Sequence, residues 1–299
     1  MNQRNSLLLT LLGLLAALGG CVPKQQALPD NPYRIEPGGR PWIIAHGGAK
    51  ALFPENTMMA FEGAMRIGVD ALEMDVNLTQ DDVLVTLHDL TIDGMSDGSG
   101  EAIGYTFAEL QAFNFAHDFQ ALDGSYPLRD TVVRIPRLRE VLEAFPGTYH
   151  IIELKNPGED GKRAAALLKG LIDSLDMKDR VVIASFHDEV LRHFLSLTDG
   201  SYALSSSEEE TKDFVFTGLS AMEYLYRPRS AVVAIPTESA GIPLDAQRVI
   251  RSAHRRNMAV QYWTINEQDE MRSLIEAGAD GLITDRPDLM QEVLEEMGF

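Results

Sequence analysis

Two histidines and a set of carboxylates occur where short apolar runs of the sequence end. His46 follows the run Trp42–Ala45 and precedes two glycines, and His88 follows a run that ends at Leu87. A histidine can take up and release a proton near neutral pH, so one that is held in position can act as a general acid or base. The two residues are therefore candidates for an acid–base pair, although a single histidine at a strand end is often structural.

Three carboxylates and one lysine occur at similar places. Glu73 and Asp75 are two residues apart in Ala-Leu-Glu-Met-Asp-Val, and Glu153 and Lys155 are two apart in Ile-Ile-Glu-Leu-Lys. In a strand, this spacing places both members of each pair on one face. Exposed strands also alternate charges, and Lys155 could simply pair with Glu153. If the three carboxylates converge inside a fold, however, they need a cation, and oxygen donors alone favour Mg²⁺ or Ca²⁺ over zinc.

The elements that must position these residues alternate between short β-branched runs and amphipathic helical patterns, which is typical of a parallel sheet built from βα units. The expected strands are Trp42–Ala45, Ala71–Val76, Val83–Leu87, His150–Leu154, Val181–Ala184, Tyr202–Leu204, Ala231–Ile235, Val260–Trp263 and Gly281–Ile283. The expected helices are Thr57–Ile67, Lys162–Leu175, Asp188–Ser196, Ala246–Arg256 and Gln268–Ala277.

The second and third strands must form an antiparallel hairpin, because the segment 77–82 between them is too short for a parallel crossover. Setting the third strand aside leaves eight, which predicts an α/β fold of the TIM-type (β/α)8 barrel with its active site at the carboxyl ends of the strands. A turn centred between Gln80 and Asp81 would place Glu73 directly opposite His88. That carboxylate would raise the pKa of the imidazole and fix its orientation.

The stretch 89–149 has weak periodicity and many turn residues, and it is longer than an ordinary connecting loop. We expect an insertion after the hairpin that covers the mouth of the barrel.

The N-terminal part of the chain has the composition of a targeting segment. Residues 1–20 contain a positive start and an apolar run with the shape of a secretory signal peptide. Leu18-Gly19-Gly20-Cys21 resembles the cleavage box of bacterial lipoproteins, which implies a lipid on Cys21, the only cysteine. The alternative is a plain signal peptide followed by a chance cysteine.

Residues 21–40 are rich in Pro, Gly and Gln and are expected to form a tether, with the barrel domain at 41–299. The expected location is the cell envelope, with the domain outside the cytoplasm, and the choice of inner or outer membrane stays open.

The net charge limits the classes of ligand that the protein is expected to bind. With 26 Lys and Arg against 45 Asp and Glu, the formal charge is −19. So acidic a surface argues against nucleic acid as a partner. An anionic small molecule would need a metal ion or a few placed cations. The sequence indicates no protein partner.

Seven short motifs follow one another along the chain. They are His46-Gly47-Gly48, Pro54-Glu55-Asn56-Thr57 with Ala60-Phe61, Glu73-Met74-Asp75-Val76, His88-Asp89, Glu153-Leu154-Lys155, Trp263-Thr264-Ile265-Asn266 and Asp280-Gly281-Leu282-Ile283-Thr284-Asp285-Arg286-Pro287. In this order the motifs resemble those of the glycerophosphodiester phosphodiesterase family, which is similar to the phospholipase C barrels. The resemblance runs from about Ile43 to Met290.

The resemblance implies roles for these positions. Glu73, Asp75 and Glu153 would bind one divalent ion, Mg²⁺ or Ca²⁺, and Lys155 would offset charge on the phosphate. His46 and His88 would exchange base and acid roles, with the glycerol 2-hydroxyl as nucleophile and water opening a cyclic phosphate afterwards. Glu55 and Asn56 are expected at the phosphate, and Trp263 is expected as an apolar wall, unless it is a core residue.

Two positions depart from the family pattern. Gly47 stands where the family usually carries an arginine after the first histidine, and Asp93-Gly94-Met95 stands where a second arginine is usual. Lys50 could substitute for a missing phosphate contact, or the site could rely more on the metal. The departures bear on substrate preference more than on activity.

Three functions compete at this level. The leading one is hydrolysis of glycerophosphodiesters to glycerol 3-phosphate and an alcohol. A lysophospholipase D-like activity is the second, because Phe113, Phe115 and Phe119 could form a slot for an acyl chain or simply pack the insertion down. The third is a substrate-binding lipoprotein without turnover, for which paired acid and base groups would have no use.

Overall fold

Eight parallel strands form the barrel that the sequence predicts. The computed structural model describes residues 30–198, 200–219 and 226–299. The strands follow the order β6-β5-β4-β2-β1-β11-β10-β7, and a parallel bridge between Ser205 and Val232 joins the two ends of this order. Their bounds are β1 Trp42–Ala45, β2 Ala71–Leu78, β4 Tyr149–Leu154, β5 Val181–Ala184, β6 Ala203–Leu204, β7 Val232–Ile235, β10 Ala259–Tyr262 and β11 Gly281–Thr284. All eight lie within two residues of the expected bounds.

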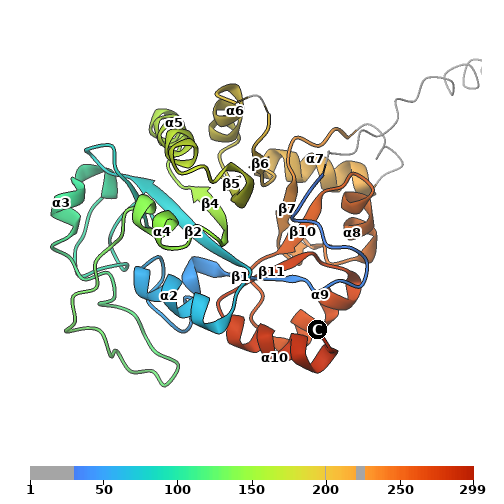
Figure 1. Ribbon diagram of the computed structural model, residues 1–299, viewed down its shortest axis with the longest axis horizontal. Helices are drawn as coiled ribbons and strands as arrows, with labels where there is room; N and C mark the ends of the chain where they lie inside the picture. The colour runs from blue at the N-terminus through green and yellow to red at the C-terminus, as the bar shows by residue number, and fades with distance from the viewer. Residues whose placement is uncertain (1–29, 199, 220–225) are drawn as a thin grey trace, which may run out of the picture.

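A helix follows each of these strands and covers the outside of the barrel (Figure 1). The ring consists of α2 Met58–Ile67, α4 Leu138–Ala144, α5 Gly158–Leu175, α6 Asp188–Ser196, α7 Glu208–Leu219, α8 Gln247–His254, α9 Gln268–Ala277 and α10 Pro287–Met297. The expectation included five of them and missed α4, α7 and α10. The signals of α10 are in the sequence, with a proline at its first position and Gly298 in a left-handed conformation after its end.

The β2–β3 hairpin is confirmed, but its register differs from the expected one. β3 (Leu84–Thr86) runs antiparallel to β2, and Val76 pairs with Thr86. The turn is therefore one residue wider, because the Thr79 side chain accepts a hydrogen bond from the backbone of Val83 at 3.0 Å. β3 ends at Thr86, and the last backbone hydrogen bond between the two segments runs from Leu87 to Asp75 at 2.9 Å, so His88 lies beyond the strand. The prediction that Glu73 lies directly opposite His88 is wrong.

The segment before β1 closes the bottom of the barrel, where the strands begin. Tyr33 is 2% exposed and packs inside the barrel against Trp42 and Tyr149, with ring centroids 5.6 and 5.8 Å away. The Asn31 side chain donates to the carbonyls of Ala231 and Asn257, both at 2.7 Å. In Figure 1 this segment runs beside β7, β10 and α8. Residues 31–40 are thus part of the fold and not of a free tether, and residues 21–29 lie outside the described part.

Replacing Tyr33 by Ala should lower the free energy of unfolding by ~3–5 kcal/mol, because it removes a large buried ring and leaves a cavity at the barrel bottom. Urea denaturation of the variant and the parent protein measures the difference. Tyr126→Ala is the matched control, since Tyr126 is 41% exposed. A Tyr33 variant as stable as the control would show that the N-terminal segment does not stabilise the barrel.

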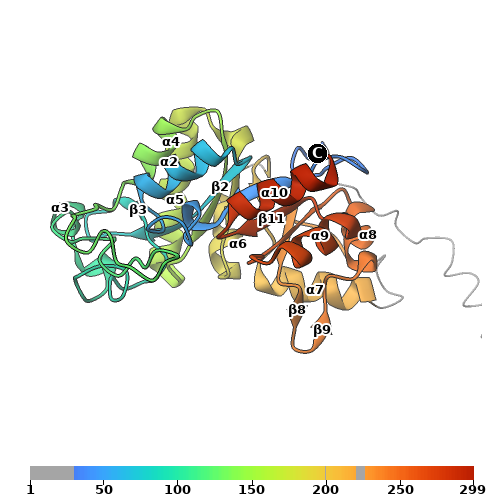
Figure 2. The ribbon, with the colours of Figure 1, turned by 90° about the horizontal axis from the view of Figure 1, so that it is seen from below.

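The stretch 89–149 contains two different parts. Its first part, with the short 3₁₀ helix η2 (Ala102–Gly104) and α3 (Phe107–Leu110), surrounds β3 with its own apolar cluster, which includes Phe115. Its last part contains α4, which packs into the main core through Leu138, Val141 and Leu142. The first part extends from one side of the barrel in Figures 1 and 2.

A second hairpin was not expected from the sequence. β8 (Glu238–Ser239) and β9 (Ile242–Pro243) pair antiparallel after β7 and project from the body in Figure 2. Two further 3₁₀ helices, η1 (His46–Gly48) and η3 (Lys178–Arg180), complete the elements. None of the helices in the described residues is both long and apolar enough to cross a bilayer.

Candidate active site

A cavity of about 250 Å³ opens at the carboxyl ends of the strands. Most of the residues singled out from the sequence line this cavity. They come from strands and loops throughout the barrel, from His46 after β1 to Ile283 in β11. The polar residues lining it are His46, Glu73, Asp75, His88, Glu153, Lys155, Ser185, Ser205, Ser206 and Thr264. This end of a β/α barrel is where such enzymes carry their active sites.

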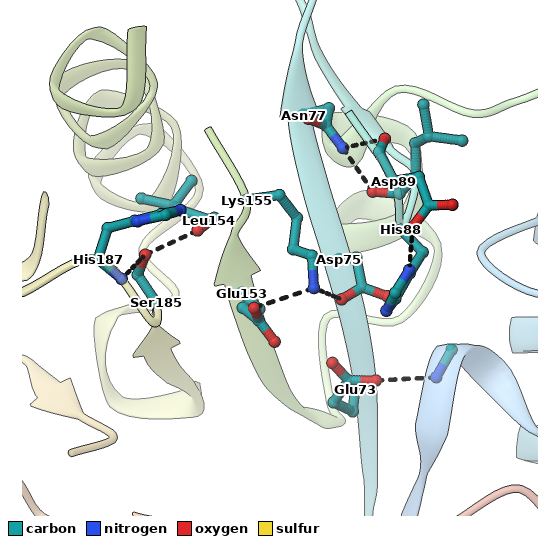
Figure 3. Close-up of polar contacts among 12 residues, drawn as sticks. Glu73, Asp75, Asn77, His88, Asp89, Glu153, Leu154, Lys155, Ser185 and His187 are labelled. Atoms are coloured by element: carbon teal, nitrogen blue, oxygen red, sulfur yellow. Dashed lines mark hydrogen bonds and ion pairs between the residues drawn. The ribbon is translucent and has the colours of Figure 1, made fainter. Parts of the chain in front are cut away.

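The three carboxylates meet as expected. One oxygen from each of Glu73, Asp75 and Glu153 lies within 4.8 Å of the others. β2 and β4 place them there, because Asp75 pairs in register with Glu153 and Glu73 lies two residues earlier on the same face. The Gly47 backbone donates to Glu73 at 2.8 Å. Figure 3 shows the three side chains converging between the two strands.

Lys155 lies between two of these carboxylates. Its Nζ is 3.2 Å from Asp75 Oδ1 and 3.0 Å from Glu153 Oε1 (Figure 3). Although burial opposes the charged form, both carboxylates raise the pKa of Lys155, so it stays cationic. For Asp75 burial would raise the pKa, but Lys155 and His88 lower it, so Asp75 stays ionised.

One lysine does not balance three carboxylates, of which Glu73 and Asp75 are buried and Glu153 is partly buried. Burial and the neighbouring charge of Asp75 raise the pKa of Glu73 to about 8, and burial also raises the pKa of Glu153. Both groups thus resist ionisation in the absence of another cation. An oxygen-only trio with this charge deficit fits a divalent ion, so these residues could hold a metal.

His46 is held by an aspartate from the other end of the chain. Its Nδ1 lies 2.6 Å from Asp285 Oδ1, and Asn266 in turn donates to Asp285 at 2.8 Å. Burial by itself would lower the pKa of His46, but Asp285 and Glu73 raise it above its ordinary value. Because an ionised carboxylate only accepts hydrogen bonds, Nδ1 carries the proton and Nε2 is left for a substrate.

His88 lines the same cavity and is also held by an aspartate. Its Nδ1 lies 2.7 Å from Asp89 Oδ1. The side chain of Asn77 donates to the carbonyls of Leu87 and Asp89, at 2.8 and 2.9 Å, and so fixes this bend (Figure 3).

Glu55 and Asn56 lie behind the cavity and do not line it. Asn56 is 1% exposed, donates to Asp75 at 2.9 Å and accepts from the Asp75 backbone at 3.1 Å. It therefore positions a carboxylate, which differs from the phosphate contact we expected. Glu55 Oε2 is buried without a hydrogen-bond partner among the described residues, and burial raises the pKa of Glu55.

Lys50 lines a different cavity from the histidines. A second hollow of about 340 Å³ is bordered by Lys50, Glu55, Phe119 and Asp285. The structure therefore does not place Lys50 among the residues of the main cavity. Gly47, at the position of the usual arginine, has φ +53 and lies close to Glu55.

The apolar wall of the main cavity is formed by Trp263 together with Phe186. Their rings meet edge to face at a centroid distance of 6.0 Å, and Phe186 remains half exposed. Sequence reasoning missed Phe186 and the serines at the ends of β5 and β6. It also gave no role to Asp285, Asn266 or Asp89, although all three lie in the quoted motifs. Position directly after a strand was the signal that could have found Ser185 and Ser205.

Together these features define a β/α-barrel enzyme whose site combines two aspartate-held histidines with a carboxylate trio. The model of the glycerophosphoryl diester phosphodiesterase family matches residues 46–289. A glycerophosphodiester phosphodiesterase of Bacillus altitudinis is 30% identical over 270 residues, covering 85% of this chain and 98% of its own. The chain therefore belongs to this family and is a phosphodiesterase.

Solved structures agree on the fold. A glycerophosphodiester phosphodiesterase from Agrobacterium tumefaciens superposes with a TM-score of 0.67 at 22% identity, covering 85% of this chain and all of the other. A phosphodiesterase of Oleispira antarctica, solved with the product sn-glycerol-3-phosphate, superposes with a TM-score of 0.67 at 21% identity. The match covers 85% of this chain and 97% of the other.

Proposed function

We propose that the chain hydrolyses glycerophosphodiesters to glycerol 3-phosphate and an alcohol by acid–base catalysis through His46 and His88. The observation that carries this proposal is the pair of histidine–aspartate contacts, at 2.6 and 2.7 Å, at the cavity that also holds the carboxylate trio. Each aspartate fixes Nδ1 as the donor and leaves Nε2 at the reacting group.

Glu73, Asp75 and Glu153 would hold one divalent ion, Mg²⁺ or Ca²⁺. When bound, the ion would draw charge from a phosphoryl oxygen as a Lewis acid. Lys155 remains cationic between two of these carboxylates and adds positive charge toward the phosphate.

One histidine takes the proton of the glycerol 2-hydroxyl, and the other gives a proton to the departing alcohol oxygen. When water opens the resulting cyclic phosphate, the two exchange roles. Asp285 stabilises His46 in its charged form, as the raised pKa of His46 indicates. Trp263 and Phe186 supply an apolar wall, and Ser185 and Ser206 line the same cavity. The Ser185 hydroxyl is already used to donate to the Leu154 carbonyl at 2.8 Å.

The lysophospholipase D-like alternative has little support from the insertion. Phe115 belongs to the apolar cluster around β3, and Phe113 packs edge to face on Tyr105. Phe115 and Phe119 border the second cavity, and none of the three lines the cavity that holds the histidines. We therefore expect no slot for an acyl chain in the main cavity.

A substrate panel tests the proposed function. The catalytic efficiency on glycerophosphocholine should exceed that on lysophosphatidylcholine by at least ~10-fold, since the site has no partner for the extra methylenes. Choline release measures both rates, and the His46→Ala variant is the inactive control. Comparable rates on the two substrates would favour the lysophospholipase reading, and binding without release would favour a binding protein.

We also propose that the enzyme is anchored to a bacterial membrane through a lipid on Cys21, with the barrel outside the cytoplasm. The sequence before Cys21 supports it, and the chain has no other cysteine to form a disulfide. Cys21 lies outside the described residues, so the support comes from the sequence alone.

A further inference from the structure

The N-terminal segment enters the barrel on the face opposite to the active site. Asn31 binds the backbone just before β7 and β10, and the Asp280 side chain accepts from the Ile35 backbone at 2.7 Å just before β11. His46, Glu153 and Ser185 all lie at the other ends of their strands. A chain held at its N-terminus is thus held by the bottom of the barrel.

The segment between Cys21 and this attachment is short. Cys21 and Asn31 are ten residues apart, so even a fully extended chain spans at most roughly 35 Å. A compact domain of this size is roughly 45–50 Å across. To turn the mouth onto the bilayer, the segment would have to run past the whole height of the domain, and it is too short for that.

We propose that the barrel mouth faces away from the membrane to which Cys21 is attached, so that the enzyme acts on water-soluble glycerophosphodiesters and not on lipids of that bilayer. This inference rests on the proposed lipid anchor. The segment is long enough for the barrel to lie upright or on its side, but not inverted.

A competing arrangement would use apolar side chains near the mouth to dock on lipid. Phe186 and Ile242 are 51% and 41% exposed, in the loop after β5 and in the hairpin after β7. Single exposed apolar residues are common on soluble surfaces. Docking through them would put the Asn31 attachment about one domain diameter above the bilayer, beyond the reach of the segment.

Fluorescence energy transfer to labelled lipid headgroups tests the orientation. The full-length chain is reconstituted in phosphatidylethanolamine–phosphatidylglycerol vesicles, and each variant carries one added cysteine, which is its only free thiol once Cys21 is lipidated. Glu36→Cys and Asp179→Cys place the label at the bottom, and Ser239→Cys places it in the β8–β9 hairpin after β7. All three positions are exposed.

The bottom labels should transfer at least about threefold more strongly than the Ser239 label, given a domain roughly 45–50 Å across. Equal or stronger transfer from Ser239→Cys would overturn the orientation while the anchor stands. Inserting a flexible Gly-Ser linker of about 30 residues between positions 29 and 30 should reduce the difference, because the longer segment permits inversion.

Failure of the anchor gives a different result. The Cys21→Ser variant should leave the membrane fraction, and the wild-type chain should show no free thiol. A wild-type chain that stays soluble, or a Cys21→Ser variant that stays with membranes, would overturn the anchor and the orientation with it. Turnover of glycerophosphocholine by the Cys21→Ser variant would still report the proposed activity separately.

Discussion

The Glu73→Gln variant should lose roughly 10³-fold in kcat on glycerophosphocholine, because the carboxylate trio would no longer hold its divalent ion. The fold should survive, since glutamine resembles the protonated glutamic acid that a pKa of about 8 favours in the absence of an ion. Initial rates with Mg²⁺ or Ca²⁺, and after chelation, measure the loss. Chelation should reduce the wild-type rate by a similar factor and leave the variant almost unchanged.

Metal binding supplies a readout that does not depend on activity. Adding the divalent ion should raise the melting temperature of the wild-type protein, because a ligand of the folded state stabilises it. Glu73→Gln should show little of this shift. Glu62→Gln, on the exposed face of α2, is the matched control and should keep both the rate and the shift. Full activity of Glu73→Gln in excess chelator would refute the metal site.

Replacing His46 or His88 by Ala should each lower turnover by ~10²–10⁴-fold, the usual contribution of one positioned acid or base. Metal binding and the fold should remain nearly intact, because neither residue belongs to the trio. The double variant should lose less than the product of the single losses, since both residues serve one reaction. His193→Ala, in α6, is the matched control, because His193 does not line the cavity.

A better leaving group separates the two roles. p-Nitrophenolate is a good leaving group that needs no proton from the enzyme. A p-nitrophenyl diester should therefore restore much of the activity of whichever variant lacks the acid. The variant that lacks the base should not be rescued. If the turnover of both variants falls by less than about threefold and neither variant responds to the leaving group, the two histidines are structural.

The sequence predicted the barrel because strand ends are marked by a change from apolar to polar residues. β1, β5, α6 and α9 begin and end where expected, and the short gap after β2 correctly indicated the hairpin. The register of that hairpin was wrong because the Thr79 side chain widens the turn, and hydrophobic alternation does not report such local bonds. The role of residues 31–40 was missed because a buried Tyr33 in a Pro- and Gly-rich segment has no periodic neighbours.

The residues that make up the site were easier to predict than the hydrogen-bond partners that hold them in position. Period-2 spacing was enough to place Glu73 with Asp75 and Glu153 with Lys155. The partners of the histidines depend on contacts that the spacing of residues does not encode, as with Asp285, which lies 239 positions from His46. Asn56 was assigned to the phosphate for the same reason, whereas the fold turns its side chain toward Asp75.

Product analysis by ³¹P NMR tests the central claim most directly. Purified wild-type protein with a divalent ion should convert the single resonance of glycerophosphocholine into that of glycerol 3-phosphate, with choline released in equal amount. The His46→Ala and His88→Ala variants should leave the diester resonance largely unchanged over the same time. Formation of phosphocholine, or an unchanged diester with the wild-type protein, would contradict the account.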